Sequence, residues 1–161
     1  MSCSTDGSAD RPMNESRCPV SGSPGRPVGW KTVTALVAGP VPSRQPFWLC
    51  RSPDCRVVYF AKDGGVVLSV DDLRVQPGFK AGGDLLCYCF LLGRSDLERE
   101  IQTSGRSRAA DSIAAAIKAG NCACDLRNPS GKCCLPEIRG FVGGATKRLG
   151  SSRHRYQEED H

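Results

Sequence analysis

The sequence predicts an α+β protein, with a small β lobe followed by a helical lobe. Three observations support this. Runs rich in Val, Tyr, Phe and Trp, separated by Gly and Pro turns, occupy the first half of the chain. Capped segments with a helical apolar period occupy much of the second half. The 161 residues include ten cysteines, six of them in two tight groups within the second half.

The β lobe is expected over residues 18–80. Residues 1–17 are polar and rich in Ser, Gly and Pro, so we expect them to be disordered. Residues 47–50 and 55–60 carry the β-branched and aromatic residues of two strands, which would form a hairpin around a metal. Residues 66–70, after a Gly-rich turn, are expected to form a third strand.

The helical lobe is expected over residues 81–140. Its first helix is predicted to begin at Ser95 as N-cap, with Glu98 in the capping-box position, and to end at Gly105. The second helix is predicted over residues 109–119, which are rich in alanine.

The remaining residues, 141–161, combine glycine with mixed charge and are expected to form a flexible tail. The net charge of +5 comes from scattered Arg and Lys without a basic stripe, so no nucleic-acid partner is predicted. No apolar run approaches the roughly 20 residues of a membrane-spanning helix, so no membrane insertion is expected. The chain has no convincing catalytic set of residues, and we expect that it is not an enzyme by itself.

The cysteines are best explained by metal binding in a reducing compartment. The N-terminus has no apolar segment of the kind found in export signals, so a cytoplasmic location is expected. Thiols stay reduced there, and close cysteine pairs then favour metal ligation over disulfides. A disulfide-stabilised secreted binder is the less favoured alternative.

Close cysteine pairs supply thiolates two at a time, as an iron-sulfur or metal site requires. The predicted helices lie between the two downstream groups, and a helical hairpin would bring these groups together. Two cysteines form the first group, four form the second, and four stand upstream: Cys87 and Cys89; Cys122, Cys124, Cys133 and Cys134; Cys3, Cys18, Cys50 and Cys55.

Three separated stretches carry a resemblance to a known family. They are Cys87-Tyr88-Cys89-Phe90, the stretch 120–135 with its four cysteines, and Cys50-x4-Cys55 with the following Arg56-Val57-Val58-Tyr59-Phe60. Together they resemble the N-terminal domain of CopZ-type copper metallochaperones. The similarity runs from about residue 18 to residue 138, and its helical part resembles a bacterioferritin-associated ferredoxin-like [2Fe-2S] domain. The β lobe would be zinc-ribbon-like.

The resemblance implies a [2Fe-2S] cluster in the helical lobe. Carried over by position, Cys87 and Cys89 would be two of the ligands. Cys124 and Cys134 are the favoured second pair, and Cys122 and Cys133 are the alternates. A spare thiol beside the cluster would pack in the core or take part in redox or metal relay.

The resemblance also implies Zn²⁺ in the β lobe, bound by Cys18, Cys50 and Cys55. The family motif Cys-Pro-x-Cys-Gly reads Cys-Pro-Val-Ser-Gly at residues 18–22, so Ser21 replaces one ligand. A neutral hydroxyl is a poor zinc ligand. The fourth position is therefore left to Cys3, Asp54, water or no ligand.

The function that the resemblance implies is that of a redox-active metallochaperone accessory. It would handle copper or another soft ion such as mercury, because thiolates select such ions. An electron or metal would pass to a partner, either a chaperone with a heavy-metal-associated domain or a metal-transport ATPase. The sequence contains no Met-x-Cys-x-x-Cys motif of its own. The alternative is a zinc-ribbon module that binds a protein or nucleic acid without a redox role.

Overall fold

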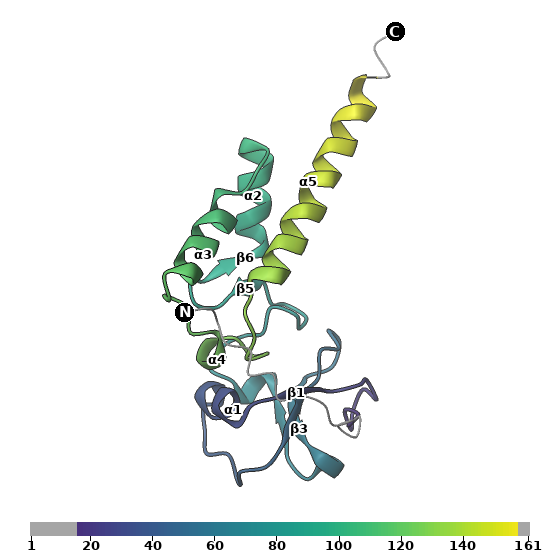
Figure 1. Ribbon diagram of the computed structural model, residues 1–161. Helices are drawn as coiled ribbons and strands as arrows, with labels where there is room; N and C mark the ends of the chain where they lie inside the picture. The colour runs from purple at the N-terminus through teal and green to yellow at the C-terminus, as the bar shows by residue number, and fades with distance from the viewer. Residues whose placement is uncertain (1–15, 158–161) are drawn as a thin grey trace.

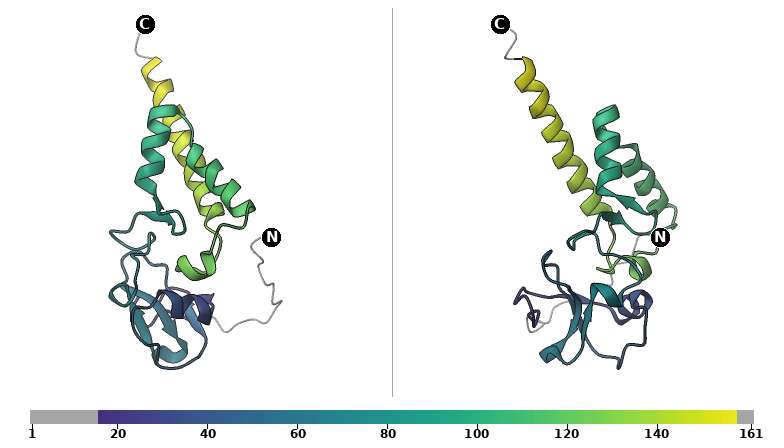
Figure 2. Two further views of the ribbon diagram at one scale, coloured as in Figure 1. Left: turned by 90° about the vertical axis from the view of Figure 1, so that its left-hand side faces the viewer. Right: turned by 180° about the vertical axis from the view of Figure 1, so that it is seen from behind.

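The protein has two lobes stacked end to end, as Figures 1 and 2 show for a computed structural model that describes residues 16–157. A lobe built on an antiparallel sheet comes first, and a lobe of three packed helices follows. The predicted α+β class is confirmed. The expectation for residues 1–15 and the candidate ligand Cys3 lie outside the described residues.

The first lobe is built on a four-stranded antiparallel sheet in the order β1-β2-β3-β4. The predicted hairpin is present, because β2 pairs with β3 in a register that places Trp48 opposite Phe60. The predicted third strand is β4, and β1 on the other edge was not predicted. The strands are β1 (Arg26–Val28), β2 (Phe47–Leu49), β3 (Val57–Ala61) and β4 (Val67–Ser69).

A short helix, α1 (Trp30–Leu36), packs on one face of this sheet. Its Val33 and Leu36 are buried, and Trp30 stacks against Phe47 with ring centroids 6.2 Å apart. Two single-turn 3-10 helices, Lys62–Gly64 and Val70–Asp72, flank β4. All five residues of β3 are buried, because α1 covers one face and Cys18, Cys50 and Cys55 lie against the other.

The second lobe begins with a hairpin of two very short strands, β5 (Leu85–Cys87) and β6 (Leu92–Gly93). The helices α2 (Arg94–Ser104) and α3 (Arg108–Lys118) follow and pack against a third helix, α5. Gly105 ends α2 with a left-handed φ of 79°, as predicted. A further one-turn helix, α4 (Cys124–Arg127), lies between α3 and α5.

The predicted start of α2 is wrong by two residues. Gly93 is the N-cap, and the carboxylate of Asp96, rather than Glu98, accepts the N–H of Gly93 at 3.0 Å. Ser95 lies in the first turn, where its N–H and hydroxyl both donate to the carboxylate of Asp84. Ser95 therefore does not cap the helix with its own side chain, because its polar groups bond to Asp84, which lies outside the helix.

The predicted flexible tail is also wrong for the described residues, because α5 runs over Leu135–Gln157. Ile138 is fully buried and Ala145 nearly so, while Phe141 and Val142 are partly buried against α2 and α3. Glycines between these apolar positions hid the helical period from the sequence. In Figures 1 and 2 the C-terminal end of α5 extends beyond the other helices. None of the described helices is long and apolar enough to cross a bilayer.

The two lobes are joined by polar contacts around α4. Thr32 Oγ1 donates to the carbonyl of Asp125 at 2.7 Å, and Lys31 pairs with the Asp125 carboxylate at 2.6 Å. The hydroxyl of Tyr59 donates to the carbonyl of Pro129 at 2.6 Å, and both residues are buried. These contacts fix the second cysteine group relative to the sheet.

Candidate metal centres

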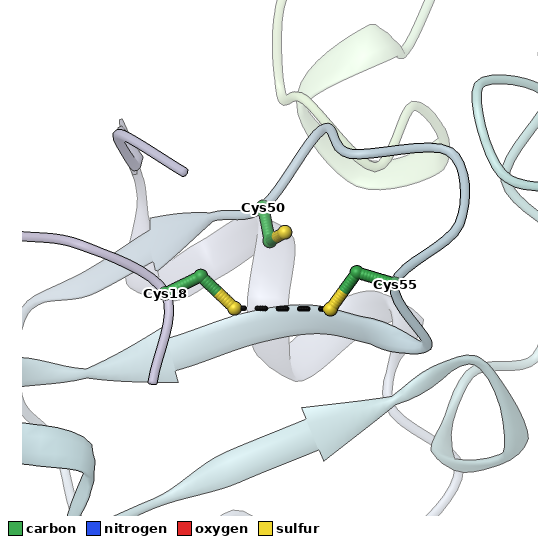
Figure 3. A group of neighbouring side chains, drawn as sticks. All are labelled: Cys18, Cys50 and Cys55. Carbon is green, nitrogen blue, oxygen red and sulfur yellow. Dashed lines mark hydrogen bonds between the residues drawn. The ribbon is translucent and has the colours of Figure 1, made fainter. Parts of the chain in front are cut away.

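The first candidate centre consists of Cys18, Cys50 and Cys55. Their sulfur atoms all lie within 4.8 Å of one another, and the Sγ atoms of Cys18 and Cys55 are 3.8 Å apart. Figure 3 shows these two side chains pointing toward each other, with Cys50 beside them at the end of its strand. The exposed fractions are 2%, 0% and 7%, so the three thiols are withdrawn from solvent.

Two turns supply these thiols. Cys18 opens the turn over residues 18–22, which is closed by a hydrogen bond from the N–H of Gly22 to the carbonyl of Cys18 at 2.9 Å. Cys50 and Cys55 lie at the adjoining ends of β2 and β3, so the hairpin register brings them together. Trp48, Val57 and Phe60 enclose the group.

Lys80 was missed by the sequence analysis as a supporting residue. It is 3% exposed, and its ammonium donates to the carbonyl of Ser52 at 2.9 Å, inside the loop that joins Cys50 to Cys55. The N–H of Ala81 donates to the carbonyl of Pro53 in the same loop. A lone lysine after a Pro-Gly turn carries no sequence signal for such a role.

The electrostatics of this group favour at least one thiolate. Burial alone would raise the pKa of Cys18, but hydrogen bonds from the side chain and backbone of Ser21 and from the backbone of Val20 outweigh it and lower the pKa to about 7. Burial raises the pKa of Cys55. A bound cation would neutralise the repulsion that these closely spaced thiolates otherwise feel.

No carboxylate fills the fourth position of this centre among the side chains that the structure describes. Among the residues whose side chains the structure describes, neither Asp54 nor any other acidic residue joins the three cysteines at ligand distance. Ser21, in contrast, places its Oγ 3.5 Å from the Sγ of Cys50. Three converging, buried thiols fit Zn²⁺, which prefers sulfur and nitrogen donors in tetrahedral sites.

The second candidate centre lies in the helical lobe, at the end nearest the sheet. Cys87, Cys124 and Cys134 are buried together, and Cys89 is partly buried against them. The Sγ atoms of Cys89 and Cys124 are 3.9 Å apart, and Cys134 belongs to the same buried cluster as Cys87 and Cys124. The structure thus brings together the four cysteines named first for the cluster.

The backbone supports this arrangement from three elements. Cys87 ends β5, Cys89 lies in the turn before β6, and Cys124 begins α4. Cys134 immediately precedes α5, whose first hydrogen bond runs from the N–H of Ile138 to the carbonyl of Cys134. The N–H of Ala123 donates to the sulfur of Cys89 at 3.2 Å, a contact of the kind that tunes thiolate-bound clusters.

Neighbouring thiols and burial shift the pKa values of these four cysteines in opposite directions. A hydrogen bond from Cys134 lowers the pKa of Cys87 to about 7 and that of Cys124 to about 6. The same hydrogen bonds raise the pKa of Cys134. Burial raises the pKa of Cys89 to about 11.

The alternates Cys122 and Cys133 lie at the edge of this group. Cys122 is partly buried and hydrogen-bonded to Cys124. Cys133 is also partly buried, and it lines a groove between the lobes together with Arg51 and Glu137, which form an ion pair at 2.9 Å. A cluster of two irons takes four thiolates, and the described residues provide them without Cys133.

Comparison with known proteins agrees with this picture for the first lobe. Residues 15–74 match the family model zf_CopZ, described as a zinc binding domain. The chain is similar to the crystal structure of the Archaeoglobus fulgidus CopZ N-terminal domain, with a TM-score of 0.62 and 28% identity over 84% of this chain and 98% of that one. A search of curated proteins gave no match. These findings support a CopZ-type zinc-binding domain in the first lobe, and metal binding as the chemistry of its three cysteines.

Proposed function

We propose that the chain is a cytoplasmic, non-enzymatic metallochaperone accessory that binds a [2Fe-2S] cluster and handles soft metal ions. The observation that carries the proposal is the convergence of Cys87, Cys89, Cys124 and Cys134 from three separate elements. When bound, such a cluster supplies one electron at a potential set by hydrogen bonds and burial. The substrate would be copper(II) or another thiophilic ion such as mercury.

The residues around the four thiols would set this chemistry. The N–H of Ala123 would stabilise negative charge on the sulfur of Cys89, and the buried Leu86, Leu97 and Ile138 exclude water from the other thiols. Cys89 is partly exposed, so it marks the side from which an electron would leave. The neighbouring Phe90 and Leu91 are exposed as well.

The cluster is tested by serine substitution under anaerobic conditions. Wild-type protein should absorb between roughly 400 and 600 nm and contain about two irons per chain. Cys87→Ser and Cys134→Ser should abolish the absorption, because both thiols are buried at the centre of the group. Cys133→Ser is the matched control and should retain it. Loss of the signal in Cys133→Ser with retention in Cys134→Ser would overturn this assignment.

The redox role is tested by single turnover with copper. Dithionite-reduced, desalted protein is mixed with copper(II) and a copper(I)-specific chelator under argon. We expect copper(I) to appear as the reduced cluster is reoxidised and its visible absorption returns, with one copper(I) formed for each cluster. A separate protein with a heavy-metal-associated domain, or a metal-transport ATPase, would then accept the copper(I).

The alternative is a zinc-ribbon module without a redox role, and the metal content of the purified protein decides between the two. If the purified protein is colourless and holds only zinc, the redox proposal fails and the interaction module becomes the better description. If the protein holds iron but copper(I) does not appear, the cluster assignment stands and the copper chemistry fails.

A further inference from the structure

The first candidate centre supplies three thiols, while structural Zn²⁺ sites use four donors. The fourth thiol is missing because this chain has Ser21 at the second cysteine position of the Cys-Pro-x-Cys-Gly motif. Among the described side chains, no carboxylate joins the group. The side chain that does approach the sulfur atoms is Ser21 itself.

The spacing of Ser21 matches a tetrahedral site. With Zn–S bonds of about 2.3 Å, two sulfurs on one zinc are separated by about 3.8 Å. The Sγ atoms of Cys18 and Cys55 are 3.8 Å apart. With a Zn–O bond of about 2.0 Å, an oxygen and a sulfur are separated by about 3.5 Å. The Oγ of Ser21 and the Sγ of Cys50 are 3.5 Å apart. Each of the two distances equals one edge of such a tetrahedron, and the three sulfurs all lie within 4.8 Å of one another.

The turn over residues 18–22 holds the hydroxyl in this place. The N–H of Cys18 donates to the carbonyl of Ser23 at 2.9 Å, and the N–H of Ser23 donates back to the Oγ of Ser21 at 3.3 Å. A hydroxyl oxygen has two lone pairs, so one remains available for a metal. The hydroxyl hydrogen-bonds to Cys18, and because Ser21 is exposed its proton can bond to solvent instead once that thiolate binds zinc.

We propose that Zn²⁺ in the first lobe is bound by the thiolates of Cys18, Cys50 and Cys55 and by the neutral hydroxyl of Ser21, and that this fourth position exchanges with an external thiolate. In the exchange a new Zn–S bond forms and the Zn–O bond to Ser21 breaks. Ser21 keeps its proton, and the net charge of the site changes from −1 to −2. No oxidant or reductant takes part.

The asymmetry of the site is the physical reason for the exchange. A neutral hydroxyl is the weakest of the four donors, since zinc prefers thiolate and imidazole. The three sulfurs are buried and Ser21 is exposed, so an incoming ligand reaches zinc from the side of Ser21. Sites that keep a replaceable position bind and exchange ligands, whereas four-thiolate sites are closed. The inference concerns only the first lobe and does not depend on the cluster.

The ligand set is tested by zinc-edge X-ray absorption on the full chain with one zinc per protein in thiol-free buffer. We expect three sulfurs at about 2.3 Å and one oxygen at about 2.0 Å in the wild type, and four sulfurs in Ser21→Cys. Excess 2-mercaptoethanol should convert the wild-type spectrum to four sulfurs and leave Ser21→Cys unchanged. Four sulfurs in untreated wild type, or no response to the thiol, would overturn the proposal.

The role of the serine oxygen, as opposed to water, is tested by the rate of zinc transfer to a chromophoric chelator. Mutation of groups that only support the metal ligands commonly weakens metal binding by 10- to 100-fold. Ser21→Ala removes a direct donor, so we expect its zinc to dissociate at least about tenfold faster than that of wild type. Cys3→Ser is the matched control and should release zinc at the wild-type rate. Equal rates for Ser21→Ala and wild type would mean that Ser21 is not a donor, and faster release from Cys3→Ser would assign the position to Cys3. Either result refutes the proposal. This rate measurement does not depend on whether the Ser21→Cys variant folds.

Discussion

Removing the hydroxyl of Tyr59 should loosen the connection between the lobes. Tyr59 is fully buried, and its hydroxyl donates to the carbonyl of Pro129 at 2.6 Å. Phenylalanine keeps the ring and its packing, so the change leaves a buried carbonyl without its donor and creates little cavity. Leaving a buried polar group unsatisfied costs about 1–3 kcal/mol, and the folding equilibrium constant should fall about 5- to 150-fold.

The assay is urea unfolding of Tyr59→Phe at constant zinc, followed by tryptophan fluorescence. Thr34→Val is the matched control, because the Thr34 hydroxyl is exposed and bonds only within its own helix. We expect the control to stay within about 0.5 kcal/mol of wild type. Pro129 lies between Cys124 and Cys134, so Tyr59→Phe should also speed the loss in air of the visible absorption of the proposed cluster. A free energy of unfolding for Tyr59→Phe equal to that of the control would refute this account of the lobe interface.

Two further perturbations test other parts of the fold. Gly131 has a φ of +68°, and an added Cβ would lie 2.7 Å from the Oγ1 of Thr32, whereas Gly105 has a φ of +79° and open space around it. Gly131→Ala and Gly105→Ala should therefore share a backbone cost of about 1–2 kcal/mol, and thermal unfolding should show an additional loss only for Gly131→Ala. The hydrogen bond from the Ser95 side chain lowers the pKa of Asp84 from its ordinary 3.8, so this carboxylate stabilises the fold above about pH 4 and the contribution disappears as the pH falls through the lowered pKa. Acid titrations should show a steeper loss of stability below pH 4 for wild type than for Asp84→Asn, and identical slopes would contradict the assigned cap.

The sequence was most informative where residue type and spacing act locally. The hairpin of β2 and β3 follows from two aromatic, β-branched runs around a short loop, and Gly105 and Gly120 mark the ends of α2 and α3 because both take left-handed φ values. The α5 helix was missed because glycines interrupt its apolar period, and its stability comes from packing against α2 and α3.

The candidate sites were predicted in part for the same reason. Cysteine spacing and the family resemblance pointed to Cys18, Cys50 and Cys55. The strand register brings Cys50 and Cys55 together, and the turn over residues 18–22 adds Cys18. The approach of Ser21 to Cys50 depends on how two turns meet in space, which no local pattern encodes. The contact from Lys80 to Ser52 is likewise a tertiary contact between distant segments.

The most direct test of the two-centre account is the metal and acid-labile sulfide content of the full chain, purified under argon from cells supplied with iron and zinc. We expect about two irons, two sulfides and one zinc for each chain, because four thiolates would bind a two-iron cluster and the first lobe would bind zinc. Cys87→Ser should lose the iron and sulfide and keep the zinc. Cys50→Ser should lose the zinc and keep the iron and sulfide. A wild-type chain with zinc but neither iron nor sulfide would contradict the account.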